Sequence, residues 1–384
     1  MIFFKIFGLL GADFVVYYEA AWVVFQNHAN PYLGLITRSF PFNYPPTSLL
    51  LLWPLAFLNF KAANILWNIS SIFSVFLTIF LLLKLILPKL NRKIFLLIFL
   101  VLSFAFTIPF FPVKFNIGNG QINHFLLLLF TLSLYLYQTG RKKASAFFLA
   151  LATAIKLAPA VLILYFLIKR DYRQIGYLLL FLALFVLISL LYLPLNFQLT
   201  YLTQVAPMSF TLAAKDWYYN QSLEGFLTRS LTQSPIILTL TYFLSGLSIV
   251  LTWWRGRKIN AWRAISAVTL LYLLIHPIAL QHYFGFAIIP LILLGVDFWR
   301  THVSAKHWLL LIVAYILLAL DIKNFTQIPK EFNFLLSHDF FAVLLLWLLA
   351  LWKENISKAL ALVWVGVIIA SYLSILLCQA KLCP

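Results

Sequence analysis

The chain has 384 residues, of which 64% are hydrophobic and only 10% are charged, and its formal net charge is +18. About a quarter of the residues in a soluble domain are charged, so this composition excludes a water-soluble globular fold. The Lys and Arg residues stand in short clusters between apolar runs, as in membrane proteins that fix their orientation, and this pattern argues against nucleic-acid binding. We therefore expect an all-α polytopic membrane protein with a single integral membrane domain over residues 1–384.

The N-terminal segment predicts an incomplete first helix and then a loop outside the membrane. Residues 1–11 are apolar but too few to cross a bilayer, which takes about 20 residues, so we expect a helix stub or a truncated start. An external loop is predicted over about 12–45. The short apolar segment 46–58 follows Pro45 and Pro46, and we expect it to enter the membrane from outside and return.

Two basic clusters predict a membrane hairpin. The positive-inside rule places the clusters at 141–143 and 169–173 in the cytoplasm. One straight helix between them would put its ends on opposite sides of the membrane. The segment 144–168 is therefore predicted to be a hairpin of two short helices, broken near Lys156–Pro159.

A second hairpin is predicted by the same reasoning. The clusters at 255–263 and 300–306 are both expected inside, so 264–299 should turn back between His276 and Tyr283. Broken helices in a membrane need protein or a water-filled cavity to satisfy the exposed backbone groups. We therefore expect an internal polar cavity.

The remaining apolar runs predict ordinary crossings. They are expected at about 61–83, 94–110, 122–138, 175–193, 235–254, 308–321, 339–352 and 358–377. This gives roughly eight to nine full crossings, in addition to the short broken or re-entrant helices. The external loops are expected at about 12–45, 110–121, 194–234 and 322–338.

The ten carboxylates are few enough for a catalytic acid to be sought by elimination. Most fall beside cytoplasmic clusters or in the later external loops, which leaves Asp13 and Glu19. Asp13 opens a segment at the outer membrane boundary, and the alternative interpretation is that it only caps a helix. Tyr17 lies four residues later on the same helical face, whereas Glu19 points elsewhere.

Two cations stand apart from the basic clusters. Lys156 lies alone at membrane depth, where charged residues are costly and usually functional, and it could meet a lipid phosphate or snorkel to an interface. Arg229 ends the stretch that begins at Asn220. A guanidinium there suits a phosphate, but a salt bridge with Glu224 or a lipid headgroup contact explains it equally well.

The late hairpin carries two of the seven histidines, His276 and His282. They are either interfacial histidines of a helix turn or functional groups that face the expected cavity. Cys378 and Cys383 match no metal-ligand spacing. No Asp-x-Asp signature is present, so we predict no cofactor and no obligatory divalent metal.

The order of several short segments resembles glycosyltransferase family 87, the polyprenol-phosphate-mannose-dependent mannosyltransferases with the type C glycosyltransferase fold. The matching segments are Asp13-Phe14-Val15-Val16-Tyr17-Tyr18, Asn30-Pro31-Tyr32, Phe42-Asn43-Tyr44-Pro45-Pro46, Asn119-Gly120-Gln121-Ile122-Asn123, Ala154-Ile155-Lys156-Leu157-Ala158-Pro159, Asn220-Gln221-Ser222-Leu223 and Gln281-His282-Tyr283. They lie on predicted external loops or hairpin tips.

The resemblance implies a set of site residues. Asp13 is expected to act as the catalytic base and His282 to assist it. Residues expected near the donor phosphate and sugar are Lys156, Arg229, Tyr17, Tyr44, Asn119, Gln121, Asn220 and Tyr283. The chemistry expected is inversion at the anomeric carbon of a sugar carried on a polyprenyl phosphate.

The sequence thus predicts an enzyme that transfers a hexose, typically mannose, from a polyprenyl-phosphate-sugar donor to a glycan or lipid-linked acceptor. It is expected in a bacterial cytoplasmic (inner) membrane, with the active site on the periplasmic or extracellular side. Three alternatives stay open: a transporter or flippase for a lipid-linked or anionic solute, a type C enzyme with a non-mannose donor, and a non-catalytic assembly partner.

Overall fold

The computed structural model describes residues 11–32, 41–209, 217–231, 236–321 and 334–352. The regular structure of these residues is helical, apart from one isolated antiparallel β-bridge between Asn220 and Leu280. The chain divides into two compact units. The first unit comprises Met1–Pro109 and Val113–Leu212, and the second comprises Phe110–Pro112 and Ala213–Pro384. The single membrane domain expected from the sequence stays a prediction.

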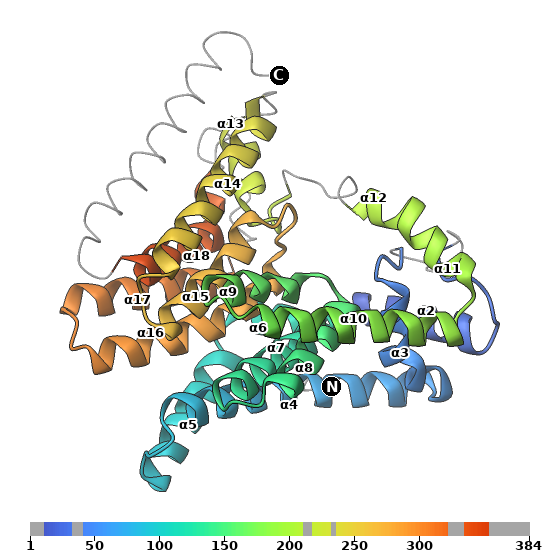
Figure 1. The fold of residues 1–384 in the computed structure, drawn as a ribbon, viewed down its shortest axis with the longest axis horizontal. Coiled ribbons are helices and arrows are strands. Elements are labelled where there is room, and N and C mark those ends of the chain that lie inside the picture. The colour runs from blue at the N-terminus through green and yellow to red at the C-terminus, as the bar shows by residue number, and fades with distance from the viewer. Residues whose placement is uncertain (1–10, 33–40, 210–216, 232–235, 322–333, 353–384) are drawn as a thin grey trace. The chain divides into compact units, whose positions relative to one another are not determined.

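The first unit is a row of helices in which α10 packs on α8, α8 on α7, and α7 on α4 (Figure 1). Its elements are α2 (Ala12–Phe25), η1 (Pro46–Ser48), α3 (Leu49–Leu52), η2 (Trp53–Phe57), α4 (Phe60–Ile86), α5 (Arg92–Thr107), most of α6 (Phe111–Asn119), α7 (Asn123–Gln138), α8 (Lys142–Ile155), η3 (Ala158–Val161), α9 (Leu162–Ile168), α10 (Tyr172–Tyr192), α11 (Leu195–Thr200), η4 (Tyr201–Val205) and α12 (Ala206–Ser209). Helix α2 packs on η2 and α3 within this unit.

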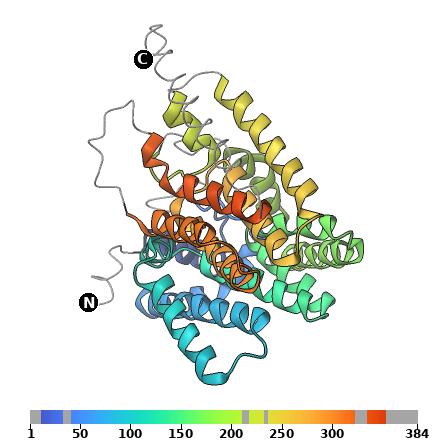
Figure 2. The ribbon, with the colours of Figure 1, turned by 90° about the vertical axis from the view of Figure 1, so that its left-hand side faces the viewer.

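The second unit is centred on two buried helices, α15 and α18, which pack on each other. Its elements are α13 (Leu223–Leu231), α14 (Ile236–Gly256), α15 (Ala261–Ile275), η5 (Gln281–Ala287), α16 (Ile288–Arg300), α17 (Ala305–Ala319) and α18 (His338–Leu351). Helix α18 also runs beside α17, and the two are the red and orange helices of Figure 2. Arg263 and Arg255 donate to the carbonyl oxygens of Leu349 and Leu351, which satisfies the end of α18.

Four helical stretches in the described part of the chain are long and apolar enough to cross a membrane. They are α4, α10, α14 and the continuous stretch Gln281–Arg300. Helices α5 and α6 would make a fifth span as a pair, bent by 65°. The roughly eight to nine crossings predicted are not confirmed, because α15, α17 and α18 have only 14 to 15 residues each. The predicted crossing 358–377 lies outside the described residues.

The hairpin predicted at 144–168 is confirmed. Lys142 and Tyr137 both donate to Asp171, at 2.5 and 2.9 Å, so the two ends of the segment meet. Helix α8 ends at Ile155, four residues before Pro159, as expected from the clash of a proline ring with the carbonyl of residue i−4. Lys156 is extended there, with φ −155° and ψ 133°.

The turn predicted in the second hairpin is also confirmed. Helix α15 ends at Ile275, and His276 is extended before Pro277, as residues before proline prefer. The chain returns through η5 and α16 until Asp297 accepts from Asn260 at 2.7 Å and lies 3.3 Å from Arg263.

The predicted external loop at about 12–45 contains α2, and the loops predicted at 110–121 and 194–234 contain short helices. The loop expected at 110–121 is largely α6, and the loop expected at 194–234 contains α11, η4, α12 and α13. These helices are 4 to 9 residues long and less apolar than a membrane span, so hydropathy gave no signal for them. The segment predicted at 46–58 forms the short helices η1, α3 and η2.

Candidate functional site

Asp13 lies in the first turn of α2. Gly11 is the N-cap, with a positive φ of 72°, and its N–H donates to the carbonyl of Gly118 at 2.9 Å. No side chain caps this helix, so the interpretation of Asp13 as the N-cap is wrong. The carboxylate is half-buried and stands where the helix dipole favours negative charge.

Gln121 joins the Asp13 carboxylate to two tyrosines. The hydroxyl of Tyr17 donates to Gln121 Oε1 at 3.1 Å, which leaves the Gln121 amide nitrogen as the group that hydrogen-bonds to Asp13. Tyr44 Oη lies 2.7 Å from Tyr17 Oη. Because the Tyr17 hydrogen is already committed to Gln121, the Tyr44 hydroxyl donates to Tyr17. A directed chain therefore runs from Tyr44 through Tyr17 and Gln121 to Asp13.

Lys156 lies in the same region. Its Nζ donates to Asn123 Oδ1 at 3.2 Å and lies 5.5 Å from the centroid of the Tyr44 ring. Its charge acts electrostatically on Asp13. We call Asp13, Tyr17, Tyr44, Gln121, Asn123 and Lys156 the Asp13 cluster; all six belong to the first unit.

Burial raises the pKa of Asp13 above its ordinary value. The hydrogen bond from Gln121 and the positive charge of Lys156 act in the opposite direction but do not outweigh burial. A carboxylate in this state takes up a proton more readily than an exposed one. The cluster thus combines a basic carboxylate with the amino group of a nearby lysine.

The backbone at Gly120 holds this cluster together. Gly120 has a φ of 68°, and a Cβ there would stand 2.6 Å from the Cβ of Phe14 on α2. Its carbonyl accepts from Trp67 Nε1 at 2.8 Å. The loop that carries Gln121 is therefore pressed against the helix that carries Asp13. Asn119 ends α6 and is half-buried.

Sequence reasoning assigned no role to Asn123, although the residue belongs to the quoted Asn-Gly-Gln segment. Asn123 begins α7 and is 2% exposed. Its amide nitrogen is buried with no hydrogen-bond partner among the described residues. Spacing could have found it, since it is two residues from Gln121 on the same short loop.

The other predicted residues lie in the second unit, around the β-bridge. Gln221 N–H donates to Ala279 O at 2.8 Å and Gln281 N–H donates to Tyr219 O at 3.1 Å, on either side of the Asn220–Leu280 bridge. The Asn220 side chain is fully buried. This pairing fixes the residue before His282.

Arg229 is buried and holds the same loop in place by hydrogen bonds. Its guanidinium donates to the carbonyls of Trp217 and Asn220 at 2.9 and 2.8 Å, and twice to the hydroxyl of Ser337, at 3.1 and 2.8 Å. These bonds give Arg229 a structural role in addition to the phosphate contact predicted for it.

His282 and Tyr283 lie near the start of η5, in the returning half of the hairpin. Their rings meet edge to face, with centroids 4.7 Å apart. The ring of His276 packs on Tyr283 at 5.3 Å, so both predicted histidines flank one tyrosine. The predicted catalytic residues thus divide between the units, with Asp13 in the first and His282 in the second.

No group of three or more His, Cys, Asp or Glu residues arranged to hold a metal ion is found among the described residues. Cys378 and Cys383 lie outside those residues.

Comparisons with known proteins identify relatives of the chain. The model of Glycosyltransferase family 87 matches residues 42–277. The chain is also similar to the polyprenol-phosphate-mannose-dependent alpha-(1-2)-phosphatidylinositol mannoside mannosyltransferase of Mycobacterium tuberculosis, with 26% identity over 279 residues. That match covers 69% of this chain and 64% of the relative. No solved structure shows a significant match. Asp13 and His282 fall outside the region matched to the family.

Proposed function

Because the chain belongs to glycosyltransferase family 87, we propose that it transfers a hexose, mannose in the first instance, from a polyprenyl-phosphate-sugar donor to a glycan or lipid-linked acceptor. The observation that carries this proposal is the Asp13 cluster, in which a carboxylate and the cation of Lys156 share one region of the first unit. Family membership favours this activity over the transporter alternative.

Asp13 is proposed to be the catalytic base. It accepts the proton of the acceptor hydroxyl as that oxygen attacks the anomeric carbon, and the bond to the phosphate oxygen breaks. Burial brings the pKa of Asp13 closer to the operating pH, where a general base is most effective. The Gln121 amide orients the carboxylate, while Tyr17 and Tyr44 fix the amide.

Lys156 is proposed to meet the departing polyprenyl phosphate. Negative charge develops on that group as the sugar leaves, and a fixed cation in a region of low dielectric stabilises it. Phosphate is a good leaving group, so no separate general acid is assigned. The reaction would invert the anomeric centre, as in single-displacement sugar transfer.

The remaining assignments stay proposals from the family resemblance. His282 would assist the base, and Tyr283, Asn119, Asn220 and Arg229 would contact the donor. No cofactor or divalent metal is assigned a role. We also propose a type C fold with roughly eight to nine crossings, in a bacterial inner membrane, with the reaction on its outer face. The apolar helices support the multi-pass membrane part of this proposal.

The test compares Asp13→Asn with Glu19→Gln, the same chemical change on the same helix. Each variant is reconstituted in proteoliposomes with radiolabelled polyprenyl-phosphate mannose and a membrane glycolipid extract as acceptor. D13N should lose about 10²- to 10⁴-fold in turnover, the usual contribution of a general base, while E19Q should transfer normally. Transfer by D13N at the wild-type rate would overturn the assignment of the base. If the wild type transfers no mannose, polyprenyl-phosphate mannose is not its donor.

A further inference from the structure

A second polar cluster lies buried at the start of α18, outside the residues assigned so far. His338 is 2% exposed, and Asp339, Gln221 and Gln281 are fully buried. Polar groups held this deeply are costly unless they are bonded to one another, and in membrane proteins they are usually functional. The sequence predicted no role for His338 or Asp339.

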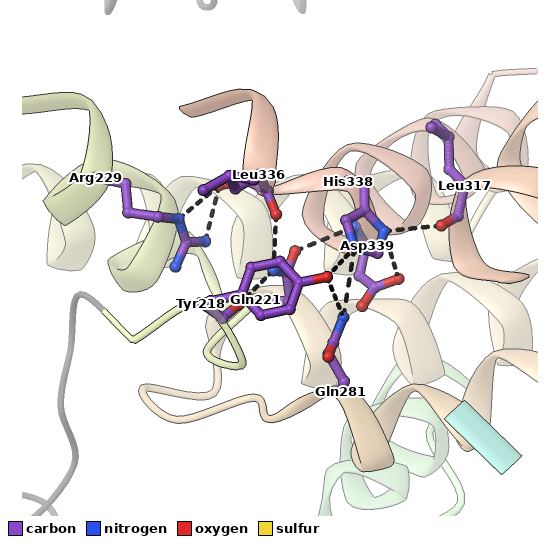
Figure 3. Close-up of polar contacts among 9 residues, drawn as sticks. Tyr218, Gln221, Arg229, Gln281, Leu317, Leu336, His338 and Asp339 are labelled. Atoms are coloured by element: carbon purple, nitrogen blue, oxygen red, sulfur yellow. Dashed lines mark hydrogen bonds and ion pairs between the residues drawn. The ribbon is translucent and has the colours of Figure 1, made fainter. Parts of the chain in front are cut away.

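The bonds of His338 define its tautomer. Nδ1 lies 2.8 Å from the carbonyl oxygen of Leu317, which can only accept, so Nδ1 carries a hydrogen. In the neutral ring Nε2 is then an acceptor, and it lies 3.1 Å from the hydroxyl of Tyr218 and 3.4 Å from Nε2 of Gln281. His338 thus joins α17 on one side to Tyr218 and Gln281 on the other (Figure 3).

Asp339 supports that tautomer. Its Oδ1 lies 3.2 Å from His338 Nδ1. The carboxylate stands in the first turn of α18, where the helix dipole favours it. A negative charge beside Nδ1 keeps the hydrogen on that nitrogen.

Gln221 ties the same helix end to the loop. Its side-chain nitrogen donates to the carbonyls of Tyr218 and Leu336 at 2.7 and 2.9 Å, and its Oε1 accepts from the backbone N–H of Asp339 at 3.2 Å. Gln281 Nε2 donates to the hydroxyl oxygen of Tyr218 at 3.4 Å, and Gln281 precedes His282 in η5. The start of α18 therefore holds the backbone on both sides of the β-bridge.

We propose that His338 and Asp339 are positioning residues for His282 and Tyr283, acting through Tyr218 and Gln281. His338 fixes the Tyr218 hydroxyl and the Gln281 amide, and these set the start of η5, from which the His282 and Tyr283 side chains project. Asp339 holds the imidazole in the tautomer that this requires. The inference rests on the proposed function for its effect on turnover but has a structural readout of its own.

Two substitutions of His338 separate its two nitrogens. The amide nitrogen of H338N takes the place of Nδ1 and keeps the bond to Leu317 but offers nothing to Tyr218. The amide oxygen of H338Q takes the place of Nε2 and still accepts from Tyr218. We expect H338N to lower kcat about tenfold to a hundredfold, the effect of a catalytic group misplaced by about 1 Å, with donor KM unchanged. H338Q should retain most of the wild-type kcat.

A double-mutant comparison tests whether Tyr218 and His338 act as one unit. Tyr218→Phe removes the hydroxyl that His338 accepts, so Y218F should lower kcat as H338N does. The double variant should be no slower than either single variant, because the same bond is lost once. Additive losses, or equal activity of H338N and H338Q, would overturn the proposal.

Hydrogen–deuterium exchange gives the readout that does not depend on catalysis. In detergent-solubilised full-length protein, peptides covering 217–222 and 278–284 should exchange faster in H338N than in H338Q or wild type. His307→Asn, a buried histidine of α17 bonded to Ser304, is the matched control and should change neither exchange nor kcat. Unchanged exchange in H338N refutes the positioning role. If exchange in H338N increases as expected but the wild type transfers no mannose, the proposed function is refuted and the positioning role is not.

Discussion

The Gln121 side chain hydrogen-bonds to the Asp13 carboxylate and accepts the hydroxyl hydrogen of Tyr17 at the same time. One amide thereby sets both the direction of the carboxylate and the direction of the tyrosine chain. A change at Gln121 should therefore alter the reactivity of Asp13 without touching the carboxylate.

Replacement of Gln121 by leucine should shift the pH dependence of turnover. The Gln121 hydrogen bond lowers the pKa of Asp13, so its loss allows burial to raise that pKa further. The base acts only when ionised, so the acidic limb of kcat/KM should move to higher pH, and kcat should fall about tenfold. The measurement is kcat/KM against pH for Q121L, with Gln138→Leu on α7 as control. An unmoved acidic limb would separate Gln121 from the base.

Replacement of Lys156 by methionine should weaken use of the donor. Methionine keeps the length of the side chain and removes the charge, so a charge-assisted bond to phosphate is lost at about 1.5–3 kcal/mol. Donor KM should rise about tenfold to a hundredfold while acceptor KM is unchanged. Lys169→Met, at the far end of the hairpin, is the control. Equal effects on donor and acceptor KM would contradict a phosphate role.

Gly120 and Gly140 offer a matched pair for the packing of the Asp13 cluster. Both have positive φ, 68° and 84°, but a Cβ at Gly140 meets nothing within 4 Å. G140A should destabilise the protein by about 1–2 kcal/mol for the left-handed backbone alone. G120A should cost a further ~1–3 kcal/mol, because its Cβ meets Phe14, and should lower activity. Thermal unfolding in detergent compares the stability of the two variants. Equal losses of stability would show that Phe14 can move aside at no cost.

Asp171 should make the stability of the hairpin depend on acid pH. Burial acts to raise its pKa, but the bonds from Lys142, Tyr137 and Gln174 N–H together hold the pKa below its ordinary value. A depressed carboxyl pKa stabilises the fold above the unfolded-state pKa, and the contribution disappears as pH falls through the folded-state pKa. The melting temperature of the wild type should therefore fall more steeply below about pH 4 than that of D171N, whose asparagine still caps α10. D171A should lose the cap as well, about 1 kcal/mol.

Charge and chain-breaking residues predicted more of this structure than hydropathy did. The basic clusters around Lys142 and Asp171 required a hairpin, and Pro159 located its break. Each of these sequence features is local and is compatible with only one arrangement of the chain. The number of crossings could not be predicted in this way. Helices such as α15 and α18 are shorter than a bilayer is thick, so an apolar run does not distinguish a crossing from a buried core helix.

The candidate site was predictable in its residues but not in its contacts. Asp13 and Lys156 stood out because charge is rare in an apolar chain. The chain from Tyr44 through Tyr17 to Gln121 joins three separate segments, and no periodicity encodes such long-range pairing. His338 was not predicted, because a polar pair at the start of a helix has the same sequence pattern as an ordinary exposed cap.

The salt bridge between Lys142 and Asp171 bears on how the protein inserts into its membrane. Lys156 is the single charged residue between Lys143 and Lys169, so insertion of this closed hairpin carries one cation into hydrocarbon, at about 2.5–3.5 kcal/mol on translocon scales. Asn123 and Tyr44, the groups that receive this cation, belong to separate segments that must dock independently. The penalty of insertion is therefore offset only at a later stage of biogenesis, when the Asp13 cluster assembles.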